Sequence, residues 1–146
     1  MTYYAVIDTN VIVSSMLKPK SIPGRIVELV NTGTIVPLIN EEILQEYFEV
    51  ITRNKFNFDD FLIESTISAI KSKAIYLQKE QTLEDFIDKD DIVFFEIVMS
   101  ARSTMDAYLI TGNMKHYPIR SYVVTPTQIL EIIEKDKESI EKTDNP

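Results

Sequence analysis

Short apolar runs along the chain alternate with stretches whose apolar residues recur at helical spacing. Residues 3–7 form a nearly continuous run of aromatic and β-branched side chains that ends at a single acid, Asp8. Such a run is typical of a strand buried on both faces, so we expect a central strand of a parallel sheet here. The runs at 35–39 and 107–111 have the same character, and 122–124 predicts a further short strand.

The first two connections are predicted as helices. A helix over 11–17 is interrupted by Pro19 and Pro23 and resumes over 26–30. After the second strand, Asn40 is a suitable N-cap for the helix that follows.

Three further helices are expected in the second part of the chain. Residues 59–80 are predicted as one long amphipathic helix. Its inward-facing candidates are Phe61, Ile67, Ile70, Ala74 and Leu77. The next helix buries Phe94 and its apolar neighbours. Thr125 and Gln128 have the spacing of a capping box, which predicts a last helix to about Lys142 whose polar end, from about residue 136, should fray.

This alternation of strands and helices predicts an α/β fold with a central parallel sheet and helices on both faces. A length of 146 residues, with 45% apolar and 26% charged residues, fits one domain over 1–146. The absence of cysteine excludes disulfides and thiolate nucleophiles, and a single histidine excludes an ordinary zinc site. Three glycines are too few for a glycine-rich phosphate loop, and no apolar run is long enough for a membrane helix. We therefore expect a soluble, cytoplasmic protein with no membrane partner.

The net charge of −8 excludes a polybasic protein that neutralises phosphates non-specifically. Residues 80–96 hold seven acidic residues and one lysine, whereas the rest of the chain holds 16 acidic and 14 basic residues. The acidic excess is therefore local, and bound divalent cations would offset part of it. A polyanion is therefore expected to approach this segment only when divalent metal is bound.

Polar side chains follow two of the predicted strands. Ligands of open α/β sheets bind beyond the carboxyl ends of the strands, and Asp8 and Asn113 both stand in such places. Asp8 is also a suitable N-cap for the helix that follows it, so its position alone leaves both roles open.

Further carboxylates lie on the predicted helices. Glu46 lies at the edge of the apolar stripe of its helix, where either a groove-lining or an ordinary surface glutamate would lie. The acids from Asp88 to Asp91 open the Phe94 helix, where capping and the helix dipole favour them. Asp91 nevertheless falls on the apolar side and should point toward the sheet edge. Glu96 lies away from that face and is predicted to be solvated unless the fold curls around it.

Asp8, Glu46 and Asp91 belong to three separate elements and are expected to converge. Clustered carboxylates repel one another unless a cation shares the site, and ligation by oxygen alone selects Mg²⁺ or Mn²⁺. Metal-assisted chemistry on phosphate is the reaction that this composition permits most readily.

Four segments of the sequence also carry a family resemblance. In order they are VIDTN, EEILQEYFEVITR, DKDDIVFFE and YLITGNMKHYP. Over residues 2–133 the chain resembles the PIN domain. More narrowly, it is similar to the toxin components of toxin–antitoxin systems that are related to VapC-type ribonucleases.

This resemblance implies a metal-dependent, single-strand endoribonuclease with four acidic positions at one end of a parallel sheet. Asp8, Glu46 and Asp91 match the first three positions and would hold Mg²⁺ or Mn²⁺. Asn113 stands at the fourth, where the family often has aspartate, and its carbonyl can still coordinate a metal or position a water. These four residues are the expected catalytic set, with an activated water as nucleophile and no covalent intermediate.

Other residues of these motifs are secondary candidates. Asp88 and Glu96 match positions that are often acidic in this branch, and Thr9 and Asn10 would hold Asp8 or a water by hydrogen bonds. His116 is either a proton donor to the leaving group or a hydrogen-bonded structural residue. Thr111 is a further secondary candidate at the site, and Lys115, Arg53 and Lys55 are candidate RNA contacts. For Arg53 and Lys55, ordinary surface charge is the alternative.

The predicted protein is thus the ribonuclease toxin of a toxin–antitoxin pair, with RNA as substrate, a cognate antitoxin as partner and a homodimer as assembly. One alternative is a PIN-like module that has lost metal competence through Asn113 and binds RNA or protein. A haloacid-dehalogenase-like phosphatase would share the Asp-Thr-Asn start. In a phosphatase of that kind the metal-binding acids would follow the segment at Thr111, whereas in this sequence the acidic cluster precedes it. The second aspartate of the phosphatase's first motif is also missing, because Asn10 occupies its place.

Overall fold

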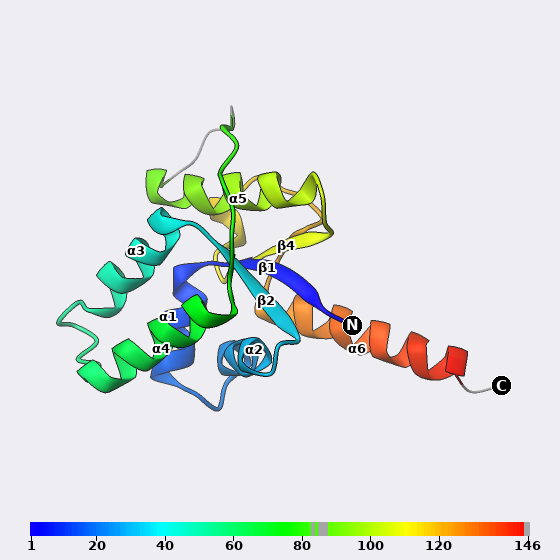
Figure 1. The fold of residues 1–146 in the computed structure, drawn as a ribbon, viewed down its shortest axis with the longest axis horizontal. Coiled ribbons are helices and arrows are strands. Elements are labelled where there is room, and N and C mark those ends of the chain that lie inside the picture. Colours follow the sequence, from blue (N-terminus) through cyan, green and yellow to red (C-terminus); the bar gives the residue numbers. More distant parts are fainter. Residues whose placement is uncertain (83, 85–87, 145–146) are drawn as a thin grey trace.

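A parallel five-stranded sheet forms the centre of the protein in the computed structural model, which describes residues 1–82, 84 and 88–144 (Figure 1). The strands are β1 (Tyr3–Ile7), β2 (Ile35–Ile39), β3 (Ile75–Tyr76), β4 (Ala107–Ile110) and β5 (Val123–Val124). Their order across the sheet is β3-β2-β1-β4-β5, so β1 is the central strand. The carboxyl ends of β1 and β4 are neighbours, with Ile7 opposite Ile110.

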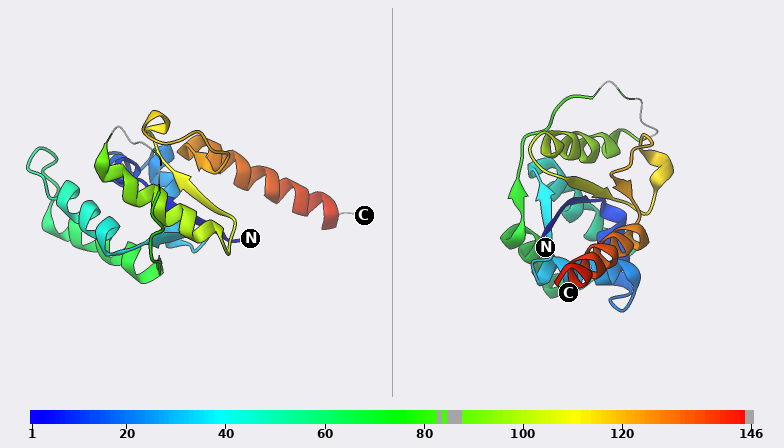
Figure 2. Two further views of the ribbon diagram at one scale, coloured as in Figure 1. Left: turned by 90° about the horizontal axis from the view of Figure 1, so that it is seen from above. Right: turned by 90° about the vertical axis from the view of Figure 1, so that its right-hand side faces the viewer.

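Helices cover both faces of this sheet. They are α1 (Thr9–Leu17), α2 (Ile22–Asn31), α3 (Glu41–Ile51), α4 (Asp60–Lys73), α5 (Ile92–Arg102) and α6 (Pro126–Asp144), with the short 3-10 helices η1 (Lys89–Asp91) and η2 (Met114–His116). Helix α5 packs on one side of the sheet against β1, β2 and β4, whereas α2, α4 and α6 lie on the other side (Figures 1 and 2). The predicted α/β fold with a parallel sheet is confirmed.

Burial of β1 on both faces explains its apolar run. Ala5, Val6 and Ile7 are at most 1% exposed. Burying an aliphatic side chain of this size stabilises a fold by about 1.5–3 kcal/mol, so the sequence has little room for polar residues before Asp8.

Local capping signals act as the sequence predicts. The Asn40 side chain accepts a hydrogen bond from the Ile43 amide at 2.9 Å at the start of α3. At the start of α6, the Gln128 amide donates to Thr125 Oγ1 at 3.1 Å, and the Thr125 amide donates to Gln128 Oε1 at 2.9 Å. This is a complete capping box.

The prediction of one helix over 59–80 is wrong. Helix α4 ends at Lys73, and the next residues form β3, which pairs Ile75 with Leu38 of β2. The free edge of β2 captures a β-branched and aromatic pair that would otherwise continue the helical spacing. Ile70 is buried as expected, but Phe61, also expected to face inward, is 81% exposed, and Ile63 is the other buried residue of α4.

Two other element boundaries also differ from the prediction. Pro23 does not interrupt a helix but lies in the first turn of α2, where its missing N–H costs no intrahelical hydrogen bond. Helix α6 is helical as far as Asp144, over the polar segment that was expected to fray, and its C-terminal part extends beyond the body of the domain (Figures 1 and 2).

Asp85, one of the seven acids in 80–96, lies outside the described residues. Within the described part of the chain, none of the helices combines the length and the apolar character that a bilayer crossing needs.

Candidate active site

A cavity of about 390 Å³ opens beyond the carboxyl ends of β1 and β4. We call it the acidic cavity, because five of the residues that line it are carboxylates: Asp8, Glu46, Asp88, Asp90 and Asp91. The other predicted site residues that line it are Thr9, Asn10, Arg53, Lys55, Asn113 and His116. The structure therefore brings together, from five separate segments, most of the residues that the sequence singled out.

Asp8 lies buried at the end of β1, with 5% of its surface exposed. Its Oδ2 accepts three hydrogen bonds, from Thr111 Oγ1 at 2.7 Å, from Asn10 Nδ2 at 3.0 Å and from the Tyr117 hydroxyl at 3.1 Å. Burial raises the pKa of Asp8, and these hydrogen bonds oppose the rise. Asp8 stands at the N-cap position of α1, but its side chain makes no capping hydrogen bond to this helix, so the carboxylate serves the site rather than the cap.

A hydrogen-bonded brace joins the turn after β1 to the turn after β4. Asn10 donates to Asp8 and accepts from the Gly112 amide at 3.0 Å, and the Asn113 amide donates to Thr111 Oγ1 at 2.9 Å. A Cβ atom on Gly112 would lie 3.1 Å from Asn10 Oδ1, which explains a glycine at this position. The side chains of Asn10 and Thr111 thus serve to orient Asp8.

Glu46 reaches the acidic cavity from α3. The neighbouring Tyr47 is fully buried and donates its hydroxyl proton to the Ile7 carbonyl, which anchors α3 against the end of β1. Glu46 is half-buried and points into the cavity rather than lying on the open surface. Its pKa is raised by burial and then by the charges of Asp90 and Glu49.

Asp91 stands at the N-cap position of α5, but its side chain faces the cavity, while Asp88 caps the preceding 3-10 helix η1. Asp88 Oδ1 accepts from the Asp90 amide at 3.0 Å, whereas Asp91 makes no capping hydrogen bond to α5. The Asp91 side chain is 13% exposed and its Oδ2 lies 3.1 Å from Nδ1 of His116. Burial, followed by the charges of Asp8 and Asp88, raises the pKa of Asp91 to about 6, and His116 opposes the rise.

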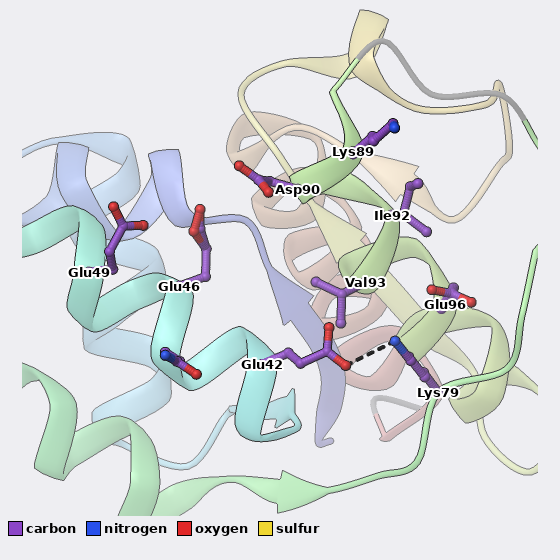
Figure 3. Close-up of a pocket in the computed structure, with 10 residues that line it drawn as sticks. Glu42, Glu46, Glu49, Lys79, Lys89, Asp90, Ile92, Val93 and Glu96 are labelled. Atoms are coloured by element: carbon purple, nitrogen blue, oxygen red, sulfur yellow. Dashed lines mark ion pairs between the residues drawn. The ribbon is translucent and has the colours of Figure 1, made fainter.

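Glu96 is not solvated, because the chain curls around it, which is the alternative that its position left open. It is 6% exposed and lines a second cavity of about 430 Å³ between α3 and α5, which shares Glu46 and Asp90 with the acidic cavity (Figure 3). The chain after β3 passes along α5, where the Glu80 amide donates to the Glu96 carbonyl and Lys79 pairs with Glu42 at 2.9 Å. This tertiary packing covers a helix position that the local pattern marks as exposed.

The predicted cations divide into two groups. Arg53 and Lys55 line the acidic cavity, and Arg53 also pairs with Glu49 at 3.1 Å. Lys115 is exposed on η2 and lines neither the acidic cavity nor the cavity around Glu96, so the structure does not bring it to the site.

Three residues at the site were missed by sequence reasoning. Tyr117 is 5% exposed and hydrogen-bonds Asp8, Asp90 lines the cavity, and Phe56 forms part of its wall. Tyr117 stands inside the segment YLITGNMKHYP, and its place in that motif, just after the candidates Asn113 and His116, is a usable signal. Phe56 gave no such signal, because a lone aromatic after a helix is most often a packing residue.

The donor groups of the acidic cavity fit a hard divalent cation. Asp8, Glu46, Asp91 and Asn113 offer only oxygen atoms, and the charge of Asp8 raises the pKa of both other carboxylates. Among the described residues, no three histidine or acidic side chains are close enough to hold one ion as they stand. Metal binding would therefore require the carboxylates to draw closer together.

Comparison with known proteins gives two matches. Residues 4–115 match the PIN domain, a range that includes Asp8, Glu46, Asp91 and Asn113 but ends before His116 and Tyr117. The chain is also similar to the uncharacterized protein MJ1680 of Methanocaldococcus jannaschii, with 27% identity over 145 residues that cover 89% of this chain and 91% of the relative.

Proposed function

This chain belongs to the PIN domain family, whose members are generally nucleases that use divalent metal ions, and from this premise we propose that it hydrolyses RNA phosphodiester bonds with Mg²⁺ or Mn²⁺. The observation that carries the proposal is the convergence of Asp8, Glu46 and Asp91 on one cavity at the carboxyl ends of the strands. Burial raises the pKa of all three carboxyl groups, and the charge of Asp8 further raises the pKa values of Glu46 and Asp91; a bound divalent cation would oppose these rises.

Asp8, Glu46 and Asp91 would hold the metal, with Asn113 assisting through its amide oxygen. When bound, the metal supplies positive charge that stabilises the charge developing at phosphorus and makes a water more acidic for in-line attack. Thr111, Asn10 and Tyr117 keep the Asp8 carboxylate facing the cavity.

His116 has a distinct place in this arrangement. Its Nδ1 is engaged by Asp91, so Nε2 is the nitrogen that can donate a proton to the leaving oxygen or contact a phosphate.

We further propose that the protein acts as the toxin of a toxin–antitoxin pair, working as a homodimer that a cognate antitoxin inhibits. The sequence resemblance described above supports this role. Co-expression with the product of a neighbouring reading frame tests it, because an antitoxin should co-purify with the chain and suppress cleavage.

The decisive experiment compares the wild type with Asp8→Asn and with Asp60→Asn, which changes an exposed acid at the start of α4. Cleavage of a panel of RNAs and thermal unfolding are followed while Mg²⁺ or Mn²⁺ is titrated. We expect Asp8→Asn to lower cleavage by about 100-fold or more and to abolish stabilisation by metal, because a metal contributes several kcal/mol of transition-state stabilisation. Asp60→Asn should behave as wild type.

Two outcomes would contradict the proposal. Cleavage and metal response that survive Asp8→Asn would refute the assignment of the site. A wild type that neither cleaves RNA nor responds to metal would instead favour a binding module that has lost metal competence through Asn113.

A further inference from the structure

The loop that joins α3 to α4, residues 52–59, forms one wall of the acidic cavity and lies at the far left of Figure 1. Arg53, Lys55 and Phe56 all line the cavity. The rings of Phe56 and Phe58 are stacked, with centroids 5.5 Å apart and planes 10° from parallel. Lys55 Nζ lies 5.0 Å from the centroid of the Phe56 ring. The Phe56 ring therefore has the Phe58 ring and the Lys55 ammonium against it. A base can stack on Phe56 where the flexible Lys55 side chain swings aside to a phosphate.

The backbone holds this pair of rings in place. Asn57, between them, has a φ of 52°, in the left-handed region that asparagine adopts more readily than most residues. The Phe56 amide donates to the Arg53 carbonyl at 3.1 Å, and the Asn57 amide donates to the Asn54 carbonyl at 3.2 Å. Both rings are half-buried and pack against the core, so the aromatic surface is formed before any ligand binds.

Charge is distributed unevenly around the acidic cavity. The carboxylates come from the end of β1, from α3 and from the segment 88–91, whereas the loop contributes Arg53 and Lys55. Among the described residues, no carboxylate forms an ion pair with Lys55. A cation of this kind, next to the proposed metal site, is suited to a phosphate that flanks the reacting one.

We infer that loop 52–59 is a subsite for one unpaired nucleotide adjacent to the phosphate that is cleaved. Its base stacks on Phe56, and its phosphates contact Lys55 and Arg53. This inference rests on the proposed function, because the acidic cavity supplies the reacting phosphate. An aromatic ring beside cations is the arrangement that single-strand binding sites use, and it tolerates every base because each base has a π face. A base inside a duplex has both faces covered by its neighbours, so paired RNA is excluded from this surface.

Fluorescence titration with a short oligouridine that carries one 2-aminopurine tests the stacking, because this base loses fluorescence when it stacks. The wild-type chain is titrated in Mg²⁺ with oligonucleotides whose bridging oxygens at the phosphates are replaced by methylene groups, so that the RNA stays intact and the metal site is kept, and the 2-aminopurine is moved along the oligonucleotide. We expect quenching at one position, and we expect Phe56→Leu to remove it and to raise Kd about fivefold, or about 1 kcal/mol. Phe61→Leu, which changes an aromatic 81% exposed on α4, is the matched control and should change nothing.

Two further comparisons separate stacking from general damage to the loop. Phe56→Tyr keeps the aromatic face and should restore both quenching and affinity. An oligonucleotide that lacks the base at the quenched position should bind the Phe56→Leu variant and the chain with Phe56 equally well.

The phosphate contact has its own test. Lys55→Gln should weaken binding of the normal and the abasic oligonucleotide alike and should lower the slope of log Kd against log salt by about 0.7, the value for one phosphate of a single strand. Lys71→Gln, an exposed lysine of α4, should leave the slope unchanged.

The subsite is refuted if Phe56→Leu weakens base-containing and abasic oligonucleotides equally, if it weakens neither, or if a duplex binds with the same dependence on Phe56. Cleavage assays with an otherwise wild-type chain distinguish this failure from that of the proposed function. If RNA binding depends on Phe56 but the protein cleaves no RNA in Mn²⁺, the subsite is supported and the proposed nuclease activity is refuted. Cleavage with an unchanged KM in Phe56→Leu would keep the nuclease and refute the subsite.

Discussion

Replacing Asp91 with asparagine should stabilise the metal-free protein at neutral pH. The Asp91 carboxylate is 13% exposed and faces the charges of Asp8 and Asp88, which together with burial raise its pKa from the model-peptide value of 3.8 to about 6. A raised carboxylate pKa means that ionisation costs more in the folded chain than in the unfolded chain. The cost is fully present above about pH 6 and disappears as the pH falls through the unfolded value near 4.

The magnitude follows from the size of this shift. At about 1.36 kcal/mol for each pH unit, a rise from 3.8 to about 6 corresponds to about 3 kcal/mol. Asparagine has no charge to bury, and its amide oxygen can still accept a hydrogen bond from His116. Asp91→Asn should therefore gain up to about 3 kcal/mol over the wild type between about pH 4 and pH 7.

Urea unfolding in EDTA at several pH values measures this difference. The free energy of unfolding of Asp91→Asn minus that of the wild type should rise between about pH 4 and pH 6 and then level off. Saturating Mg²⁺ or Mn²⁺ should reverse the order, because only the wild type keeps the full set of carboxylates. A difference that stays constant with pH, or a variant that is less stable than the wild type at pH 7 in EDTA, would refute the reasoning.

Three further substitutions give separate tests. Tyr117→Phe removes one of the three donors to Asp8, so it should lower the free energy of unfolding in urea by about 1.5–3 kcal/mol and weaken stabilisation by metal. An unchanged metal response would show that the phenol does not position Asp8. Gly112→Ala places a Cβ 3.1 Å from Asn10 Oδ1 and should lower nuclease activity more than stability, so full activity would argue against the brace. Asn40→Ala removes the cap of α3 and should lower the free energy of unfolding by about 1 kcal/mol while RNA cleavage is retained. Thermal unfolding and a cleavage assay on the same variant measure the two effects.

Features that depend on nearby residues were predictable from the sequence. The apolar runs located β1, β2, β4 and β5, and the caps at Asn40 and Thr125 were found from side-chain chemistry alone. The convergence of Asp8, Glu46 and Asp91 was also expected, because Asp8 follows a strand of a parallel sheet and the helical positions of Glu46 and Asp91 point toward the apolar side of their helices.

Features that depend on distant parts of the chain were not predictable in this way. Strand β3 exists because β2 offers a free edge, and Glu96 is buried because the segment after β3 crosses α5. The role of Phe56 likewise depends on where the loop meets the acids of other elements. Periodicity records which face of an element is apolar, but it carries no information about what will pass over the other face.

The sheet ends on both sides in strands of only two residues, β3 and β5. Such short edges offer few unpaired backbone groups, so they are poor templates for another chain to add a strand and poor starting points for fibrillar aggregation. Self-assembly by edge-to-edge continuation of the sheet is therefore disfavoured. The search for a homodimer interface should therefore begin with the outer surfaces of the helices and loops rather than with the sheet edges.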